Sequence, residues 1–258
     1  MFIVFFSDPV LSPKSEKKHI DRSVIREFTK VGIPSMLTRL TNSGGRVIFT
    51  AIVAHLGTLV YSAHTISFTA ESAFYIPCVG MMSVAAAMAG RIKGEGDIDK
   101  LNRLTKTFCL FAFGVMLIMA VLMFILSDVI ISFFTDDNTV ISTASVLLRI
   151  VAVNEPLFAV SIILESIFNG IGRTKLPFIA NTISQWTFRV GGSLICINVF
   201  GLGIKAAWVC MISDNIIRCI ILSIKYLIMN KQLIEPCHSF TGIHNSHKSR
   251  NDCLLLQK

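Results

Sequence analysis

Long uncharged stretches alternate with short charged segments along the chain. The clearest stretch runs from Phe108 to Leu126, and Ser72 to Gly90 is also uncharged. About 20 apolar residues in a helix cross a bilayer core, and lipid offers the backbone no other hydrogen-bond partner outside a closed barrel. The stretches lack the alternation of barrel strands. The pattern therefore predicts six transmembrane helices, at approximately residues 28–56, 64–90, 107–133, 140–171, 176–200 and 203–229.

Two polar segments flank these spans. Residues 1–27 form a basic segment, and residues 230–258 are expected to form a disordered polar tail. The tail contains cysteines and histidines, but their spacing matches no metal-ligand pattern; they are Cys237, His238, His244, His247 and Cys253. The seven cysteines of the chain show no CxxC spacing, which favours small packing residues over a zinc site or a disulfide framework. We expect neither a bound metal nor a cofactor.

Composition supports the same class. Hydrophobic residues make up 53% of the 258 residues and the mean hydropathy is +0.66. Only 16% of residues are charged, against about 25% in a typical soluble domain. These values indicate an all-α integral membrane protein. The net charge of +8 does not indicate nucleic-acid binding, because Lys and Arg lie between the apolar stretches.

The basic residues predict the orientation. With the N-terminus in the cytoplasm, the outer segments contain one basic residue, Lys205, and the acidic pair Asp136 and Asp137. Excess positive charge marks the cytoplasmic side, so we expect a multi-pass protein of the cytoplasmic membrane with both termini inside. The predicted cytoplasmic segments contain Lys14, Lys17, Lys18, Arg22, Arg26, Lys30, Arg91, Lys93, Lys100, Arg103, Lys106, Arg173, Lys175, Lys225 and Lys231.

Several motifs follow one another in an order similar to that of a known transporter family. The motifs are Gly32-Ile-Pro34; Ala63-His64-Thr65-Ile66 with Glu71, Pro77 and Gly80; Phe133-Phe134-Thr135-Asp136-Asp137; Glu155-Pro156; Asn169-Gly170-Ile-Gly172; and Trp186, Arg189, Trp208, Asp214 and Arg218. Over residues 28–227 they resemble the C-terminal half of multidrug and toxin extrusion (MATE) transporters.

The resemblance implies a drug/cation antiporter built of two six-helix bundles with a cavity between them, of which this chain supplies the second. Such transporters place their sites at the interface between repeats. The chain would therefore need another six-helix bundle, from a separate chain or from a second copy. The implied partners are the bilayer and small organic cations, and the implied coupling ion is H⁺ or Na⁺.

Two departures from the family pattern bear on ion coupling. Arg173 stands where the family usually has Asp in the turn after Gly172, and the first span shows no acid between Ser35 and Arg39, where some branches have a cation-binding Glu. The coupling carboxylate could therefore lie in the other bundle.

Charged side chains at mid-bilayer depth are the candidate site residues. Such charges are costly and usually face a cavity or a partner. Glu71, Glu155, Arg189 and Asp214 fall near the middle of their spans, and Asn154, Gln185 and Arg39 accompany them. Arg39 and Arg46 are seven residues apart and share one helix face.

Each candidate has a structural alternative. Asp214 and Arg218 are four residues apart and can pair on one helix, which favours a structural role. Arg189 could pair with Glu71 or Glu155. For these two acids, binding of a cation and internal neutralisation remain equally open. Phe68, Phe74, Tyr75 and Phe158 are predicted to pack rather than to stack on a drug, and Asn181 could join helices.

Two prolines are candidate hinges, because proline removes a backbone hydrogen bond. They are Pro156, directly after Glu155, and Pro77, six residues after Glu71. The small-residue runs Ala85–Gly90 and Gly191–Ser193 would let helices pack closely.

The sequence shows no HExxH motif, no Walker-type glycine loop and no nucleophile with a base partner, which argues against an enzyme or an ATP-driven pump. The leading hypothesis is half of a secondary efflux transporter that exchanges cationic or amphipathic organic compounds for H⁺ or Na⁺. The alternatives are a truncated membrane remnant that transports nothing, and a flippase for lipid-linked sugars, which would use arginines in the cavity.

Overall fold

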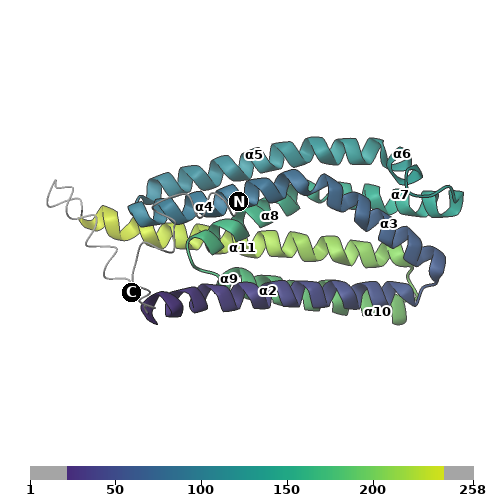
Figure 1. Ribbon diagram of the computed structural model, residues 1–258, viewed down its shortest axis with the longest axis horizontal. Coiled ribbons are helices and arrows are strands. Elements are labelled where there is room, and N and C mark those ends of the chain that lie inside the picture. The colour runs from purple at the N-terminus through teal and green to yellow at the C-terminus, as the bar shows by residue number, and fades with distance from the viewer. Residues whose placement is uncertain (1–21, 241–258) are drawn as a thin grey trace, which may run out of the picture.

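The computed structural model describes residues 22–240, with the side chains of residues 32–230 and of Arg26 and Thr29. All secondary structure in this part of the chain is helical, and the helices lie roughly parallel in one elongated bundle (Figure 1). They are α2 (Arg22–Ala54), α3 (Thr58–Phe74), α4 (Ile76–Glu95), α5 (Ile98–Ile125), α6 (Ser127–Ser132), α7 (Asn138–Ala152), α8 (Glu155–Gly170), α9 (Lys175–Ser184), η1 (Gln185–Gly192), α10 (Ser193–Asn198) and α11 (Ile204–Phe240).

The helix bounds differ from the predicted spans at both ends. Helix α2 begins at Arg22, within the predicted basic segment, and α11 continues to Phe240, beyond the predicted end at residue 229. The predictions for residues 1–21 and 241–258 lie outside the described residues. The same holds for the side chains of Cys237 and His238.

The turns of the bundle gather at two ends. The basic end contains the turns between α4 and α5 and between α8 and α9, and the opposite end contains residues 55–57, 133–137 and 199–203. Gly96 ends α4 with φ 74°, a left-handed conformation that suits glycine. Asp97 then caps α5 by accepting a hydrogen bond from the Lys100 N–H at 2.9 Å. Hydrogen bonds from the Lys100 and Arg91 side chains hold the pKa of Glu95 below its usual value.

Two of the described helices are long and apolar enough to cross a membrane alone. They are α5 and the Ile204–Asn230 part of α11. Two more spans arise if the bent pairs α3 with α4 (49°) and α7 with α8 (54°) each count as one. Helix α2 also runs the length of the bundle (Figure 1), but Arg39, Arg46 and the polar residues between them lower its hydropathy.

The remaining predicted span, residues 176–200, is divided into α9, η1 and α10. The segment η1 is a π-helix of eight residues with wider turns than an α-helix. It contains both Gln185 and Arg189. Nothing in the hydrophobic pattern predicts this change of helix type within the span.

The buried apolar residues form two separate cores. The core nearer the basic end joins α4, α5, α8 and the second half of α11, around Phe168 and Met116. The core nearer the opposite end joins α2, α3, α7 and the first part of α11, around Trp208 and Leu148. The buried acids Glu155 and Asp214 lie between these two cores.

Helices α4 and α8 approach each other closely at the basic end. A Cβ atom added to Gly170 would overlap the carbonyl oxygen of Ala86, and one added to Gly90 would lie 3.1 Å from the carbonyl oxygen of Gly170. Lys93 also donates a hydrogen bond to the Ile171 carbonyl oxygen at 2.6 Å. The small-residue run Ala85–Gly90 therefore packs against a neighbouring backbone, as the sequence predicts.

Oxidation provides a direct check on the packing of α10 against α11. The Sγ atoms of Cys196 and Cys210 lie 3.6 Å apart, and both thiols are free. We expect copper-phenanthroline with dissolved oxygen to remove two electrons and two protons and to join them in a disulfide. Two fewer cysteines should then react with polyethylene-glycol maleimide in denatured samples. In Cys196→Ser the oxidant should cause no such loss; unchanged labelling of the unsubstituted chain would contradict this packing.

Candidate functional site

A layer of polar side chains crosses the bundle between the two apolar cores. It contains Glu71 of α3, Asn154 and Glu155 at the bend between α7 and α8, Arg189 of η1, and Asp214 of α11. Three of the five side chains are almost inaccessible, at 2% for Asn154, Glu155 and Asp214. The structure therefore brings most of the predicted site residues into one layer.

Arg189 and Asp214 form a buried ion pair. Their Nε and Oδ2 atoms lie 3.2 Å apart, with side-chain exposures of 13% and 3%. The contact is not a well-aligned hydrogen bond, because Arg189 Nε finds no acceptor in suitable geometry among the described residues. The predicted pairing of Asp214 with Arg218 is therefore wrong, because a partner on a neighbouring helix replaces the one on the same helix. Arg189 forms no ion pair with Glu71 or Glu155 among the described residues, although it interacts electrostatically with Glu71.

Arg218 instead belongs to a network of amides and aromatic rings. Its guanidinium donates to the Asn215 Oδ1 at 2.7 Å and to the Asn181 Oδ1 at 3.4 Å. Asn181 in turn donates to the Glu165 Oε2 at 3.0 Å. The guanidinium carbon lies 5.3 Å from the centre of the Phe158 ring, within the range of a cation–π contact. Asn181 and Phe158 thus join helices here.

Glu71 and Glu155 have spare hydrogen-bonding capacity. One carboxyl oxygen of each is buried and has no hydrogen-bond partner among the described residues, and the same holds for both amide atoms of Asn154. The two carboxyl groups interact electrostatically with each other, and Glu71 also interacts with Arg189. Buried polar atoms are normally hydrogen-bonded, and exceptions often mark functional positions. A proton or a small cation shared by the two acids would relieve their repulsion.

Gln185 ties η1 to α2. Its side-chain amide donates to the Asn42 carbonyl oxygen at 3.0 Å, and a Cβ atom on Gly45 would overlap that amide. Gln185 is 5% exposed, and this contact gives it a part in helix packing. Its role in binding a substrate stays a prediction. Gly44 and Gly45 lie within α2, which continues unbroken past them to Ala54.

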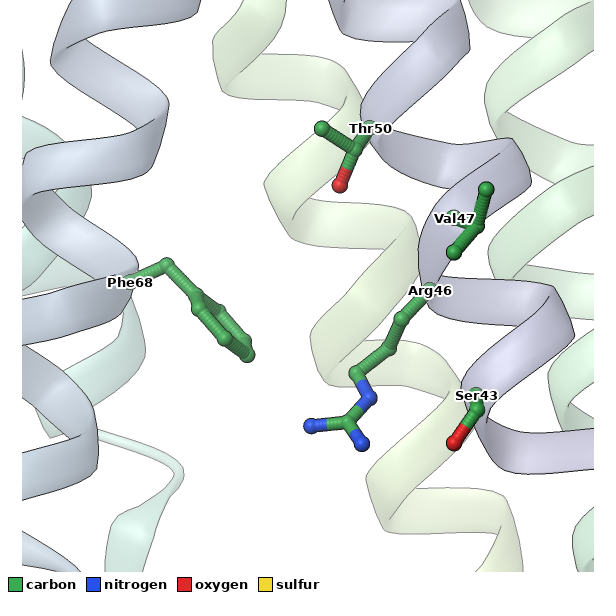
Figure 2. A pocket seen from close by; sticks show the side chains of 5 residues that line it. All are labelled: Ser43, Arg46, Val47, Thr50 and Phe68. Carbon is green, nitrogen blue, oxygen red and sulfur yellow. The ribbon is translucent and has the colours of Figure 1, made fainter. Parts of the chain in front are cut away.

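An open groove lies between α2 and α3. Its cavity has a volume of 340 Å³ and is lined by Ser43, Arg46, Val47, Thr50 and Phe68. Arg46 and Phe68 point into the groove from opposite walls (Figure 2). Arg39 lies two turns before Arg46 on α2 and is also exposed. The groove therefore combines one positive charge, two hydroxyl groups and apolar surface.

Both candidate hinge prolines lie directly after a bend. Pro77 is in the first turn of α4, after the 49° bend at Tyr75, and Pro156 is in the first turn of α8, after the 54° bend. Proline is well tolerated in the first turn, where its missing N–H is not needed. Each proline thus fits the start of a new helix rather than the interior of a kinked one.

His64 is a buried polar residue that is not among the site residues predicted from the sequence. It is 4% exposed, its ring centre lies 5.5 Å from that of Phe49 and 5.8 Å from that of Trp208, and its Nδ1 has no hydrogen-bond partner among the described residues. It also interacts electrostatically with Arg189. The feature of the sequence that could have identified His64 is its position within an apolar span.

A helical bundle with buried charged residues at mid-span is typical of one class of protein, the helical membrane transporters. The chain belongs to the MatE family, whose family model matches residues 34–195. The family consists of transporters, not enzymes, and the predictions of an integral, multi-pass membrane protein and of a MATE-type fold are confirmed.

Curated relatives carry names of the same kind. "Probable multidrug resistance protein NorM" of Thermotoga maritima is 25% identical over 193 residues, covering 75% of this chain and 42% of the relative. The mouse "Multidrug and toxin extrusion protein 2" is 24% identical over 181 residues, which is 70% of this chain and 32% of the relative. The chain thus spans less than half the length of these relatives.

Solved structures show the same fold over about half their length. "Crystal structure of MATE in the bent conformation" aligns with a TM-score of 0.83 and 18% identity over 91% of this chain and 53% of that one. A transporter of the MOP superfamily from Pyrococcus furiosus aligns with a TM-score of 0.80 and 18% identity over 89% of this chain and 53% of that one. That structure is described by the phrase "Reverse polarity of binding pocket suggests different function".

Proposed function

We propose that this chain forms one bundle of a secondary active efflux transporter that exchanges cationic or amphipathic organic compounds for H⁺ or Na⁺. The observation that carries the proposal is the pair Glu71 and Glu155, each with an unpartnered buried carboxyl oxygen. An acid within a membrane span is by default a functional candidate. A second six-helix bundle would complete the cavity, consistent with the coverage of about half of each MATE structure.

The orientation belongs to the same proposal. The described side chains at the basic end include Arg91, Lys93, Lys100 and Arg173, whereas Lys205 lies near the opposite end. The excess of basic residues supports a cytoplasmic location for the basic end, in the cytoplasmic membrane. The bends at Pro77 and Pro156 would then lie midway through the membrane, where they would act as hinges as the bundle changes conformation.

Substitution of Glu71 tests coupled transport. The gene product that carries this chain, with its second bundle, would be expressed in efflux-deficient bacteria and ethidium accumulation measured with and without an uncoupler. Glu71→Gln removes the charge at nearly constant shape, so we expect it to reduce uncoupler-sensitive efflux about tenfold or more. Glu95→Gln, at the exposed turn between α4 and α5, is the matched control and should transport normally.

Full coupled efflux by Glu71→Gln would refute the role of this acid. A lack of efflux by the unsubstituted protein would support the alternative of a membrane remnant that inserts and folds but transports nothing.

A flippase for lipid-linked sugars is the second candidate function. The observation that favours it is Arg46, the charged residue that lines the groove, since a diphosphate linkage would need a cationic partner. Rescue of a lipid-linked sugar flippase defect, without ethidium efflux, would support this function over drug export.

A further inference from the structure

We propose that the groove between α2 and α3 binds the anionic group of an amphipathic ligand, with Arg46 as the residue that recognises it. The proposal rests on the proposed transport function and narrows its substrate class. The ligand chemistry is a carboxylate, sulfonate or phosphate joined to an apolar body. Arg46 would hold the acidic group, and Phe68 and Val47 would contact the apolar part.

The first argument is that Arg46 is available. Its side chain is exposed in the groove, and among the described residues it forms no ion pair or hydrogen bond. Figure 2 shows its guanidinium projecting into the open space rather than along α2. A guanidinium presents five N–H donors in a planar fork that matches carboxylate and phosphate oxygens.

The second argument concerns depth. Arg46 lies eight residues before Ala54, the end of α2, which corresponds to about 12 Å along a helix. A charge at such depth is costly in lipid and usually faces water or a partner. The rest of the exposed surface of α2 near the groove is largely apolar, with Leu40 and Val47 among its exposed residues. An anion bound in the groove would therefore give this charge a partner.

The third argument is the sign of the charge around the groove. Asp214 is paired with Arg189, one carboxyl oxygen each of Glu71 and Glu155 is buried, and none of these acids is among the residues that line the groove. Asp214 offsets the charge of Arg189, so the positive potential of the groove comes from Arg46 itself. Arg39 adds a further exposed positive charge on the same face of α2. A cation would be repelled here, and an anion would be attracted.

The fourth argument is the remaining lining. Ser43 and Thr50 lie one turn before and after Arg46, so their hydroxyl groups can donate to an anion held by the guanidinium. Phe68, on the opposite wall, offers a flat apolar face. The cavity volume of 340 Å³ lies at the small end of the range of ligand pockets, about 300–1,000 Å³. It suits the head and first part of an amphiphile rather than a whole multi-ring drug.

The test is a binding measurement on the whole chain in uncharged detergent. The probe is 11-(dansylamino)undecanoate, detected by energy transfer from the tryptophans, and its neutral methyl amide and its trimethylammonium analogue serve as charge controls. We expect the carboxylate to bind at least about tenfold more tightly than either analogue. Arg46→Gln should remove this preference, and Arg46→Lys, which keeps the charge but not the fork, should retain part of it.

Arg26→Gln is the matched control, because Arg26 is an exposed arginine of α2 outside the groove; it should bind the carboxylate as the unsubstituted chain does. The proposal would be overturned if Arg46→Gln bound the carboxylate as tightly as the unsubstituted chain does. It would also be overturned if the unsubstituted chain bound the trimethylammonium analogue as tightly as the carboxylate. Displacement of the probe by phosphatidylglycerol in mixed micelles would identify a lipid headgroup as the source of the anion. Displacement only by short-chain sulfonates would identify a soluble amphiphile as that source.

This measurement needs no ion gradient and no second bundle. Failure of coupled efflux in the Glu71 experiment would therefore leave the binding result intact. If the unsubstituted chain showed no preference for the carboxylate, the result of the efflux experiment would likewise stand. The two proposals can fail separately.

Discussion

Replacing Asp214 by asparagine is expected to destabilise the folded bundle by about 3–5 kcal/mol, because it leaves a buried guanidinium without its counter-ion. The side chains of Arg189 and Asp214 are 13% and 3% exposed, so water cannot take over the lost interaction. The thermal unfolding midpoint of the purified chain in detergent, followed by circular dichroism, measures the effect. We expect a fall of several degrees or a loss of folded protein.

Two further variants separate a lost ion pair from general damage. In Arg189→Met with Asp214→Leu, both charges are absent, and most of the stability should return since no buried charge remains. In Asp128→Asn, the pair of Asp128 with Arg149 is broken; its side chains are 59% and 40% exposed, and we expect a loss below about 1 kcal/mol. Equal midpoints for Asp214→Asn and Asp128→Asn would show that the buried pair does not stabilise the bundle.

Gly170→Ala is expected to have the second-largest effect on stability. The added methyl group would overlap the backbone carbonyl of Ala86 in α4, and a backbone atom cannot move away as a flexible side chain can. Overpacking costs about 1–3 kcal/mol, and here we expect the upper part of that range. The same unfolding measurement tests it, together with the yield of monodisperse protein after detergent extraction.

Gly94→Ala provides the control for this substitution. Gly94 lies in α4, one turn after Gly90, and no atom lies within 4 Å of the position of its added Cβ. Alanine is favoured over glycine in a helix by about 0.5–1 kcal/mol, so Gly94→Ala should be neutral or stabilising. A similar response to the two substitutions would exclude the close contact of α4 with α8.

The membrane class could be predicted because apolar runs such as Phe108–Leu126 have one stable solution in a bilayer, which is a helix. The MATE-type fold could be predicted only because the order of motifs such as Glu155-Pro156 resembles that of the family. The bends were predicted in part: Pro77 and Pro156 are visible in the sequence, but proline also fits the first turn of a helix, so the sequence does not say where one helix ends. The structure places the ends at Phe74 and Ala152.

The pairing of charges could not be predicted from the sequence, because it depends on which helices are neighbours. Asp214 and Arg218 satisfy a local spacing rule, yet the partner of Asp214 comes from η1. The π-helical turns that contain Arg189 belong to a rare helix type, and the hydrophobic pattern of the span carries no signal for them. The contact of Gln185 with Asn42 could not be predicted for the same reason, because it is set by tertiary packing.

The division of the interior into two apolar cores has a mechanical consequence. Apolar contacts are non-directional and tolerate small displacements, whereas ion pairs and hydrogen bonds depend on direction. The bends of α3–α4 and α7–α8 both interrupt the backbone ladder between the two cores. Helices α5 and α11 run unbroken from one core to the other, so the two bends are the points at which the backbone can flex between the cores. A change in the protonation or ligation of Glu71 and Glu155 would act close to these bends, without having to repack either core.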